Sequence, residues 1–498
     1  LHSNGFGQVD KEEDEEEGPV TPVESDSSSS EDHEDAIMVK LGGCADPLLV
    51  VGSICDSMYK PISASKVGKA HAPAYGYYSD DYELGAVSRC GVRDKNEDAY
   101  VVLNDLLQKP LGMGTESDYA IDMKESYFTR FKAHGLYAIF DGHCGNQAAR
   151  FAAEKFHSIL LDESCNYDDI EDDERDDDLI LREILNASIE RLDEEFCEFC
   201  IRDGRDWYSG STAIVALMVD DKIAVASVGD ASGVLSSSSR NIDLAVMNGW
   251  SVLEEHDEDL NKLGGSKGGI VYREVAESHC PSRPAERERI QAANGWVTHE
   301  TEIPIISQFQ RMNWSDQDVL DIFHRCFSDR FSDSHGKPAR ILDIYRVCGD
   351  LAVSRAIGDR EYKAAFNRDP ALQDDQMDAG NNEWRSPAPM PFHTYQEIHK
   401  EEHTGIFEGD LVIATPSIQF FQVGSYGDDE FLVIACDGLW DVIDPDDAVR
   451  VTRNLIFVLG FSTKECAERL AELAGGLGSS DNITVIVVRF YGKSSGLS

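Results

Sequence analysis

The stretch FLVIACDGLWDVI, residues 431–443, places the strongest constraint on the fold. Phe431–Cys436 are mostly apolar and predict a buried β-strand. This strand leads directly into Asp437, a glycine and then Asp441. Because a buried carboxylate without a partner costs several kcal/mol, we expect a compensating group beside Asp437.

Three other predicted strands adjoin a carboxylate in the same manner. They are YAIFDGHCG (137–145) with Asp141, VASVGDAS (225–232) with Asp230, and SSDNITVIVV (479–488) with Asp481. Strand ends meet at the rims of sheets, so these carboxylates are expected to share one small volume.

A single Asp-Gly pair is weak support for a metal site, because the dipeptide is common in turns. The wider context is stronger, since GVRDKNEDAY (91–100) adds Glu97 and Asp98, and Arg93 supplies a planar fork that suits a phosphate. Clustered carboxylates repel one another unless a proton or a cation intervenes. Oxygen ligands without a set of Cys or His indicate Mg²⁺ or Mn²⁺, and two such ions can activate a bridging water for attack on phosphorus.

Strand signals come in groups along the chain. STAIVALMV and KIAVASVGD are strand-like runs joined by Asp220 and Asp221, as in a tight antiparallel hairpin. Three further strand-like runs are DLVIATP (410–416), EFLVIACDG (430–438) and ITVIVVRF (483–490).

Helix signals lie between these groups. Apolar periodicity predicts helices over 146–161 and 179–201. Helix starts are expected at Asp444 before a proline, and at Ser462, where Glu465 completes a capping box. Grouped hairpins with helices between them favour an α+β fold over a doubly wound sheet.

Nine blocks in this order resemble those of the type 2C metal-dependent protein serine/threonine phosphatases, the PPM family. They are GVRDKNEDAY, FDGHCG, SGSTAIVALMV, VGDASG, RPAERERIQAANGWV, RVCGDLAVSRAIGDREYK, LVIATPSI, ACDGLWDVI and SSDNITVIVV. The resemblance implies a four-layer αββα sandwich of two antiparallel β-sheets flanked by helices, with the site at one end between the sheets. It implies single-step hydrolysis of phosphoserine or phosphothreonine.

The resemblance also implies the ligands of two Mg²⁺ or Mn²⁺ ions. Asp141 would bridge both ions, and Gly142 would contribute its carbonyl oxygen. Glu97 would hold one ion, and Asp437 with Asp481 would hold the other. The bound ions would then be the partner that Asp437 requires.

Five more residues receive roles from the same resemblance. Asp98 would orient a water, Arg93 would bind the substrate phosphate, and His143 would protonate the leaving oxygen. Asp230 and Asp441 would help to form a weaker third metal site. A histidine suits proton donation because it titrates near neutrality, although a structural histidine at the rim is the alternative.

Two positions depart from the family pattern. Ala231 and Ser232 stand where Ser and Arg are typical, and Glu255 in EEHDED stands where Asp normally precedes His. These departures concern the surroundings of the third metal site and the docking of the flap, and they touch none of the primary ligands.

Composition limits the partners. The 498 residues carry a formal net charge of −48, which argues against nucleic acid because phosphate binding needs Lys and Arg. Twelve scattered cysteines, including an isolated Cys197-Glu-Phe-Cys200, fit a reducing compartment, the cytoplasm or the nucleus. No stretch reaches the length of a membrane span, although the chain begins at Leu1, so an upstream segment can be missing. We expect a monomer that acts on phosphorylated proteins.

Composition also suggests the domain boundaries. They are an acidic, largely disordered extension over 1–83, a phosphatase domain over 84–492 with insertions around 162–178, 250–283, 298–344 and 368–408, and a short tail over 493–498. Within the extension, residues 1–35 hold thirteen Asp or Glu and one Lys, with a serine run at 27–30. This segment is either a solubilising tail or a serine cluster for an acid-directed kinase.

The insertion at 298–344 contains SDQDVLDIFHRCF (315–327), which predicts a short amphipathic helix. This helix either packs on the sandwich or forms a docking surface beside the cleft. For the whole chain, the rival functions are a non-catalytic regulator with the same fold and a two-metal hydrolase of small phosphate esters. Clustered carboxylates disfavour the first, and the lack of a base-recognising or glycine-rich phosphate loop disfavours the second.

Overall fold

The computed structural model describes residues 50–51, 75–78, 82–107, 126–132, 134–167, 176–205, 207–239, 241–253, 269–302, 308, 310–331, 342–365, 407–423 and 428–491. All of these belong to one unit of the chain, Pro47–Ser498. The acidic segment at 1–35, most of the expected insertion at 368–408 and the tail at 493–498 lie outside the described residues.

Two antiparallel sheets face each other. The first has the order β1 (Val50–Val51), β4 (Ala99–Leu103), β5 (His134–His143), β6 (Gly210–Val219), β7 (Lys222–Val228) and β14 (Ser417–Gln422), and β13 (Ile357–Gly358) also pairs with β6. The second has the order β2 (Tyr75–Tyr78), β3 (Tyr82–Arg89), β16 (Ile483–Phe490), β15 (Asp428–Ala435), β8 (Ser232–Ser239), β10 (Gly269–Glu274) and β9 (Ser251–Val252).

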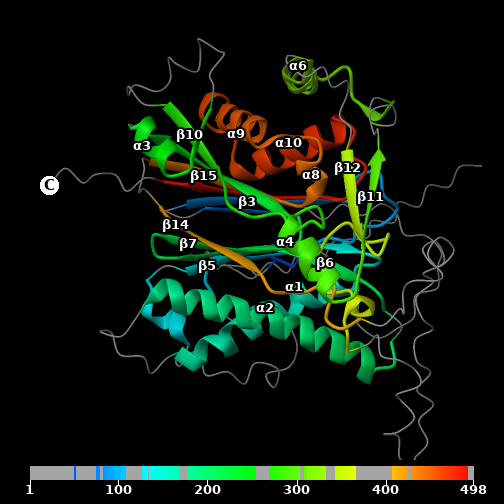
Figure 1. The fold of residues 1–498 in the computed structure, drawn as a ribbon. Coiled ribbons are helices and arrows are strands. Elements are labelled where there is room, and N and C mark those ends of the chain that lie inside the picture. The colour runs from blue at the N-terminus through cyan, green and yellow to red at the C-terminus, as the bar shows by residue number, and fades with distance from the viewer. Residues whose placement is uncertain are drawn as a thin grey trace, which may run out of the picture. The chain divides into compact units, whose positions relative to one another are not determined.

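Helices cover the outer face of each sheet (Figure 1). On the first sheet lie α1 (Gln147–Ser164) and α2 (Asp177–Arg202), and on the second lie α9 (Pro445–Arg453) and α10 (Thr463–Gly476). The expected α+β, four-layer αββα arrangement is therefore confirmed. Shorter elements are η2 (Tyr127–Arg130), η3 (Cys165–Tyr167), α3 (Ile242–Met247), η5 (Arg360–Tyr362), α8 (Asp437–Trp440) and the π-helical turn η7 (Asn454–Val458).

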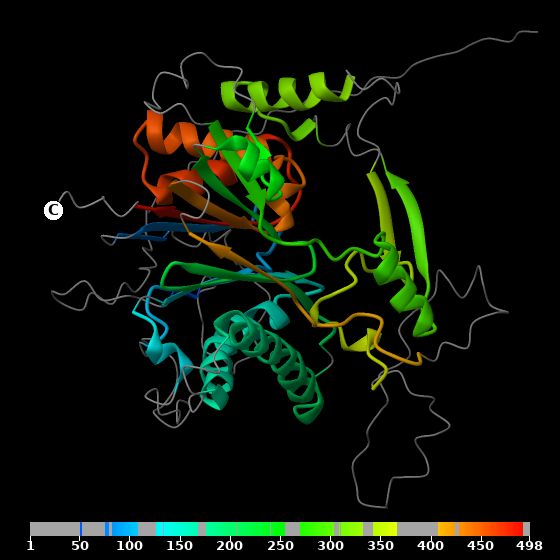
Figure 2. The ribbon, with the colours of Figure 1, turned by 60° about the vertical axis from the view of Figure 1, so that its left-hand side comes forward.

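A separate ribbon stands at one end of the sandwich (Figure 2). It consists of β11 (Val297–Glu302) and β12 (Leu342–Val347), which pair with each other and follow α4 (Pro284–Ala292). Between these two strands in the chain lies α6 (Gln317–Phe331). The helix predicted within 315–327 is confirmed.

Three apolar layers hold the sandwich together. Side chains such as Ile139 and Ile434 fill the space between the sheets. Phe140 and Phe156 pack below the first sheet, and Val433 packs with the α10 side chains above the second. Both faces of β15 are covered by apolar layers, which explains why Phe431–Cys436 is apolar throughout.

Local signals place several boundaries correctly. The β6–β7 hairpin turns at Asp220 and Asp221, and Asp220 adopts the positive φ of 50° that such a tight turn requires. Ser462 caps α10 with the expected box, because its side chain accepts from Glu465 N while the Glu465 carboxylate accepts from Ser462 N. Asp444 precedes α9, which begins at Pro445.

Two expectations about the chain are wrong. DLVIATP at 410–416 forms no strand, and Ile413 makes only an isolated bridge to Arg355. Pro416 cannot donate to a ladder, and the Thr415 carbonyl accepts from the Arg355 side chain, so β14 starts afterwards at Ser417. The region 250–283 is not wholly an insertion, because β10 pairs along its length with β8 in the second sheet.

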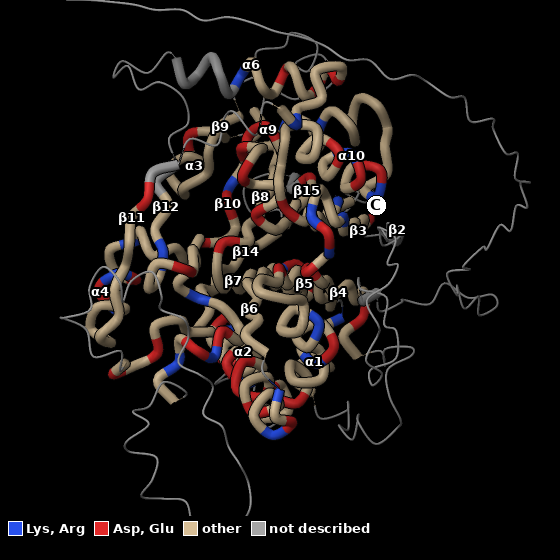
Figure 3. The backbone as a smooth tube through the Cα atoms, turned by 90° about the vertical axis from the view of Figure 1, so that its right-hand side faces the viewer, with Lys and Arg blue, Asp and Glu red and all other residues tan. Residues whose placement is uncertain are grey.

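Acidic residues are spread over both helical layers and both sheets when the ribbon end is viewed directly (Figure 3). Lys and Arg are interspersed among them along the described chain in this view. Among the described helices, none combines the length and apolar character that crossing a bilayer requires.

Candidate metal and phosphate site

Four chain segments carry the candidate residues to one region. Asp141 lies near the end of β5, in register with Thr212 on β6. Asp437 begins α8 immediately after β15, and Asp481 precedes β16. The loop that follows β3 carries Arg93, Glu97 and Asp98 before β4. Both sheets therefore contribute carboxylates.

Asp98 is the most deeply buried of them. Only 2% of the residue is exposed, and its Oδ2 accepts a 2.6 Å hydrogen bond from Thr484 Oγ1. Its Oδ1 is buried and has no hydrogen-bond partner. Burial raises the pKa of Asp98 to about 6, against the opposing effect of the Thr484 hydrogen bond. The orphaned oxygen therefore requires either a proton or a cation.

The pKa values of Asp141 and Asp437 are raised further than that of Asp98. Loss of hydration raises the pKa of Asp141 well above its usual range, and the charge of Asp437 raises it further. Burial likewise raises the pKa of Asp437, followed by the charges of Asp230 and Asp441. The cluster thus holds more negative charge than it can accommodate alone, which fits a site for divalent cations.

Ligand-type atoms of Asp98, Asp141 and Cys436 lie within 4.8 Å of one another. Cys436 is fully buried, and burial together with the charge of Asp98 raises the pKa of its thiol well above the usual range. Its Sγ donates to Asn482 O at 3.4 Å and accepts from Thr484 N at 3.1 Å. Cys436 is therefore a neutral structural thiol, and the oxygen atoms are the candidate ligands.

Glu97 is fixed against the end of β5. Its backbone N–H donates to Asn482 Oδ1 at 2.8 Å, and its Oε2 accepts from Gly145 N at 3.1 Å. Asn482 Nδ2 donates in turn to the carbonyls of Cys90 and Lys95, both at 2.9 Å. One amide side chain therefore shapes the whole acidic loop.

Gly142 lies where no side chain can fit. A Cβ atom at this position would come within 2.4 Å of the Glu97 carbonyl oxygen. The close approach of the two backbones explains the glycine and leaves Gly142 beside the carboxylates, where its carbonyl oxygen is expected to act.

Arg93 is the exposed cation of the site. Its Nη2 lies 2.5 Å from Asp481 Oδ2, and its Nε donates to Ser480 O at 2.8 Å. The Arg93 side chain remains 55% exposed. The guanidinium is thus oriented by the turn before β16 and still presents N–H groups to a solvent-borne phosphate.

His143 is held by a carboxylate that the sequence did not single out. Its Nε2 lies 2.8 Å from Asp359 Oδ2 and 2.9 Å from Oδ1. Burial alone would lower the pKa of His143, but the charge and hydrogen bond of Asp359 raise it overall. Asp359 is 1% exposed and sits at φ 47°, directly after the short strand β13. A strand followed by Gly-Asp is the same signal as at Asp230, so it could have been found.

Cys144, next to His143, is exposed but is not an activated nucleophile. Partial burial and the negative charge of Asp359 raise the pKa of its thiol. A thiolate is therefore disfavoured at Cys144.

Asp230 and Asp441 both lie close enough to Asp437 to raise its pKa. Asp441 N donates to the Asp437 carbonyl at 2.8 Å, within the single turn α8 and its end. Burial raises the pKa of Asp230 as well. The residues expected at a third metal site therefore adjoin the main cluster.

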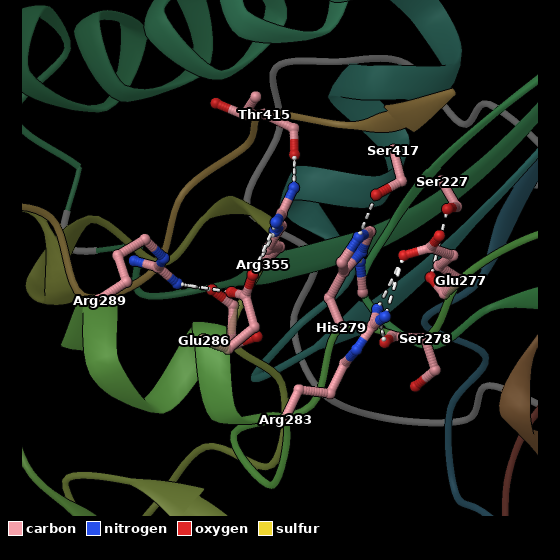
Figure 4. Close-up of polar contacts among 12 residues, drawn as sticks. Ser227, Glu277, Ser278, His279, Arg283, Glu286, Arg289, Arg355, Thr415 and Ser417 are labelled. Atoms are coloured by element: carbon pink, nitrogen blue, oxygen red, sulfur yellow. Dashed lines mark hydrogen bonds and ion pairs between the residues drawn. The ribbon is translucent and has the colours of Figure 1, made fainter. Parts of the chain in front are cut away.

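The turn at Asp230 is held by His279, a buried residue that the sequence analysis missed (Figure 4). His279 N donates to Gly229 O at 2.7 Å, and Gly229 N donates to His279 Nδ1 at 3.2 Å. Its Nε2 lies 2.8 Å from Ser417 Oγ. Burial, followed by the charge of Arg355, lowers the pKa of His279 to about 4, so the ring is neutral. Glu255, which stands where the family usually has an Asp before a His, lies outside the described residues.

Glu286 anchors α4 beside this histidine (Figure 4). Its Oε1 accepts from Arg355 Nη2 at 2.6 Å and from Nε at 3.1 Å, and its Oε2 accepts from Arg289 at 2.9 Å. Burial alone would raise the pKa of Glu286, but these arginines lower it to about 2. The α4 segment that leads to the ribbon is therefore tied to the core by charge.

Comparison with known proteins gives one family. The sequence model described as Protein phosphatase 2C matches residues 82–483. A probable protein phosphatase 2C 8 from Oryza sativa subsp. japonica is 26% identical over 423 residues, 81% of this chain and 73% of the relative. The integrin-linked kinase-associated serine/threonine phosphatase 2C of Rattus norvegicus is 24% identical over 412 residues, 80% of this chain and 70% of the relative.

Among solved structures, a serine-threonine phosphatase 2C from Toxoplasma gondii aligns with a TM-score of 0.48 at 16% identity, covering 85% of this chain and 99% of that one.

Proposed function

Because the chain belongs to the protein phosphatase 2C family, and is thereby a serine/threonine phosphatase, we propose that it dephosphorylates phosphoserine and phosphothreonine in proteins at a centre of two Mg²⁺ or Mn²⁺ ions. The single observation that supports the metal centre is the acidic cluster around the buried Asp98. The charge of Asp437 raises the pKa of Asp141, the charges of Asp230 and Asp441 raise the pKa of Asp437, and Asp98 Oδ1 is buried without a hydrogen-bond partner.

The ligand assignment follows the residues that converge there. Asp141 would serve both ions, Gly142 would contribute its carbonyl oxygen, Glu97 would hold one ion, and Asp437 with Asp481 would hold the other. When bound, the ions would supply positive charge and an activated water for attack on phosphorus. A weaker third ion would be held by Asp230 and Asp441.

The remaining steps belong to the side chains around the cluster. Arg93 binds the phosphate through the N–H groups that Asp481 and Ser480 leave available. Asp98, whose Oδ2 is fixed by Thr484, offers Oδ1 to the attacking water. His143 donates a proton to the seryl or threonyl oxygen, which is too basic to leave unprotonated. Asp359 fixes the ring of His143 for that transfer.

We also propose phosphorylated proteins as the substrates, a monomeric enzyme, and a reducing compartment such as the cytoplasm or nucleus. The rival proposal, a non-catalytic regulator, has no use for a cluster of carboxylates, because bringing several like charges together destabilises the fold.

The experiment is phosphate release from a phosphothreonine peptide by the purified chain, with and without Mn²⁺ or Mg²⁺. We expect release with either ion and none after chelation with EDTA. Release that persists in EDTA would contradict the metal centre, whereas cleavage of nucleotides or sugar phosphates in preference to the peptide would support the small-ester alternative.

A further inference from the structure

The insertion between β11 and β12 packs its apolar side onto the helices above the second sheet. Val319 and Ile322 of α6 are buried, as is Met312 just before it, and all three join the core of α9 and α10. Figures 1 and 2 show α6 on the outer side of α10. Val319 and Ile322, the buried apolar side chains among those of α6 that the structure describes, are therefore covered within this chain.

Two sets of ion pairs reinforce that contact. At the start of α6, Arg469 of α10 binds both oxygens of Asp316 at 2.8 Å and also contacts Asp318 at 2.5 Å. Near the middle of α6, Arg325 lies 2.6 Å from Asp447 on α9. The hydrogen bond from Arg469 lowers the pKa of Asp316, which keeps this pair charged at neutral pH.

The segment that precedes α6 reaches the turn at the end of α10. Asn313 N donates to Gly476 O at 2.8 Å, and Gln308 Nε2 donates to Leu477 O at 3.0 Å. A Cβ atom at Gly478 would come within 2.6 Å of the Gln308 carbonyl oxygen, and Gly478 has a φ of 90°. The turn is thus covered closely by the insertion.

The same turn leads directly into the candidate site. Ser479 Oγ donates to Gly438 O at 2.8 Å, beside Asp437. Ser480 O accepts from Arg93 Nε, and Asp481 pairs with the Arg93 guanidinium. The turn 476–481 therefore contains Asp481, contacts the residue after Asp437 and orients Arg93.

We propose that Gln308 and residues 310–325 form a brace that fixes the turn 476–481 and thereby strengthens divalent-ion binding at Asp437 and Asp481. Gln308 and Asp316 are the positioning residues. The inference rests on the proposed function, because it concerns the affinity of the same metal centre. It replaces a docking role for the insertion with a role in assembling the site.

The test compares two variants of the full chain. Gln308→Ala combined with Asp316→Ala removes the side-chain contact with the turn and the pair with Arg469 that holds the brace on α10, whereas Arg325→Ala removes the pair with Asp447 of α9. Mn²⁺ binding is measured by isothermal titration calorimetry without substrate, and unfolding temperature is measured in EDTA. We expect the first variant to bind Mn²⁺ about tenfold more weakly, as for outer contacts of metal ligands, and the control to bind like wild type. Asp316→Glu with Gln308 intact should restore most of the affinity.

Distinct results would overturn the brace. One is equal Mn²⁺ affinity in all variants while both lower the unfolding temperature alike, which means simple packing. Another is unchanged Mn²⁺ affinity with selective loss of activity on phosphoproteins and full activity on aryl phosphates, which means docking. If the wild-type chain itself binds no Mn²⁺, the proposed metal centre fails, and the brace fails with it.

Discussion

The imidazole of His143 and the carboxylate of Asp359 are joined at 2.8 Å, although 216 residues separate them in the chain. The carboxylate is almost fully buried and is held at a left-handed backbone position after Gly358. Its orientation is therefore determined by the fold before any substrate binds. This pair connects the end of β5 to the region that carries the ribbon, and it explains how one ring nitrogen is given a fixed direction.

Replacing Asp359 by Asn should slow hydrolysis of phosphoserine peptides by about tenfold or more, because the ring of His143 loses its charged partner. Aryl phosphates should be affected much less, since a phenolate leaves readily without a proton. The measurement is kcat for both substrates at saturating Mn²⁺. His143→Ala is the reference, and in a His143→Ala background the Asp359→Asn change should have little further effect. Additive losses would show that Asp359 acts independently of His143.

Asp437→Asn should abolish turnover, because a neutral amide binds a divalent ion less well and leaves the other carboxylates under-neutralised. The fold should survive, since removing one charge from the cluster relieves repulsion. Phosphopeptide turnover and the unfolding temperature in EDTA are the measurements. Activity within tenfold of wild type at saturating Mn²⁺ would remove Asp437 from the ligand set.

Gly142→Ala should also inactivate the enzyme, because its Cβ would meet the Glu97 carbonyl oxygen at 2.4 Å. One of the two backbones must move, and both lie at the acidic cluster. Mn²⁺ binding by calorimetry should weaken more than it does for Gly409→Ala, where the nearest atom to a Cβ would be 3.4 Å away. Equal affinities for the two variants would mean that the close approach is unimportant.

Glu286→Gln should destabilise the protein in a pH-dependent manner. The pKa of Glu286 in the folded protein is about 2, below its ordinary value of 4.5. Its stabilising effect is therefore complete above the unfolded pKa and is lost as pH falls through the folded pKa. We expect on the order of 3 kcal/mol at pH 7, shrinking by about 1 kcal/mol at pH 3.5. Urea denaturation of wild type and variant at the two pH values measures this difference. A gap that widens on acidification would show that the arginines do not stabilise the charged form.

Removal of residues 1–35 should leave kcat and KM for aryl phosphates almost unchanged, because such an acidic sequence contributes nothing to the candidate metal site. The measurement is steady-state kinetics at fixed Mn²⁺, with the full chain as control. A large fall in kcat after truncation would make the acidic segment part of the active unit.

The residues that could be predicted from sequence are those with a local signal. Strand ends at Asp141, Asp437 and Asp481 are marked by apolar runs, and the cap at Ser462 is marked by Glu465 three residues later. A strand followed by Gly-Asp marks Asp359 as it marks Asp230, but the sequence does not show that Asp359 meets His143. No local signal marks His279, whose partners Gly229 and Ser417 come from distant segments. Strand β10 likewise carries no local signal for its pairing, because α3 and β9 separate it in the chain from its partner β8.

The contacts of the Asn482 side chain can form only after most of this sequence has been synthesised. Its amide bonds to the backbone of Cys90, Lys95 and Glu97, which are synthesised 385 to 392 residues earlier. The strand β16, which follows it directly, is also the central partner of β3. A chain that stops short of residue 482 therefore lacks both the amide that shapes the acidic loop and the strand that lies between β3 and β15 in the second sheet. Contacts of such high sequence separation form late and slowly. We therefore expect a chain truncated before residue 482 to lack phosphatase activity.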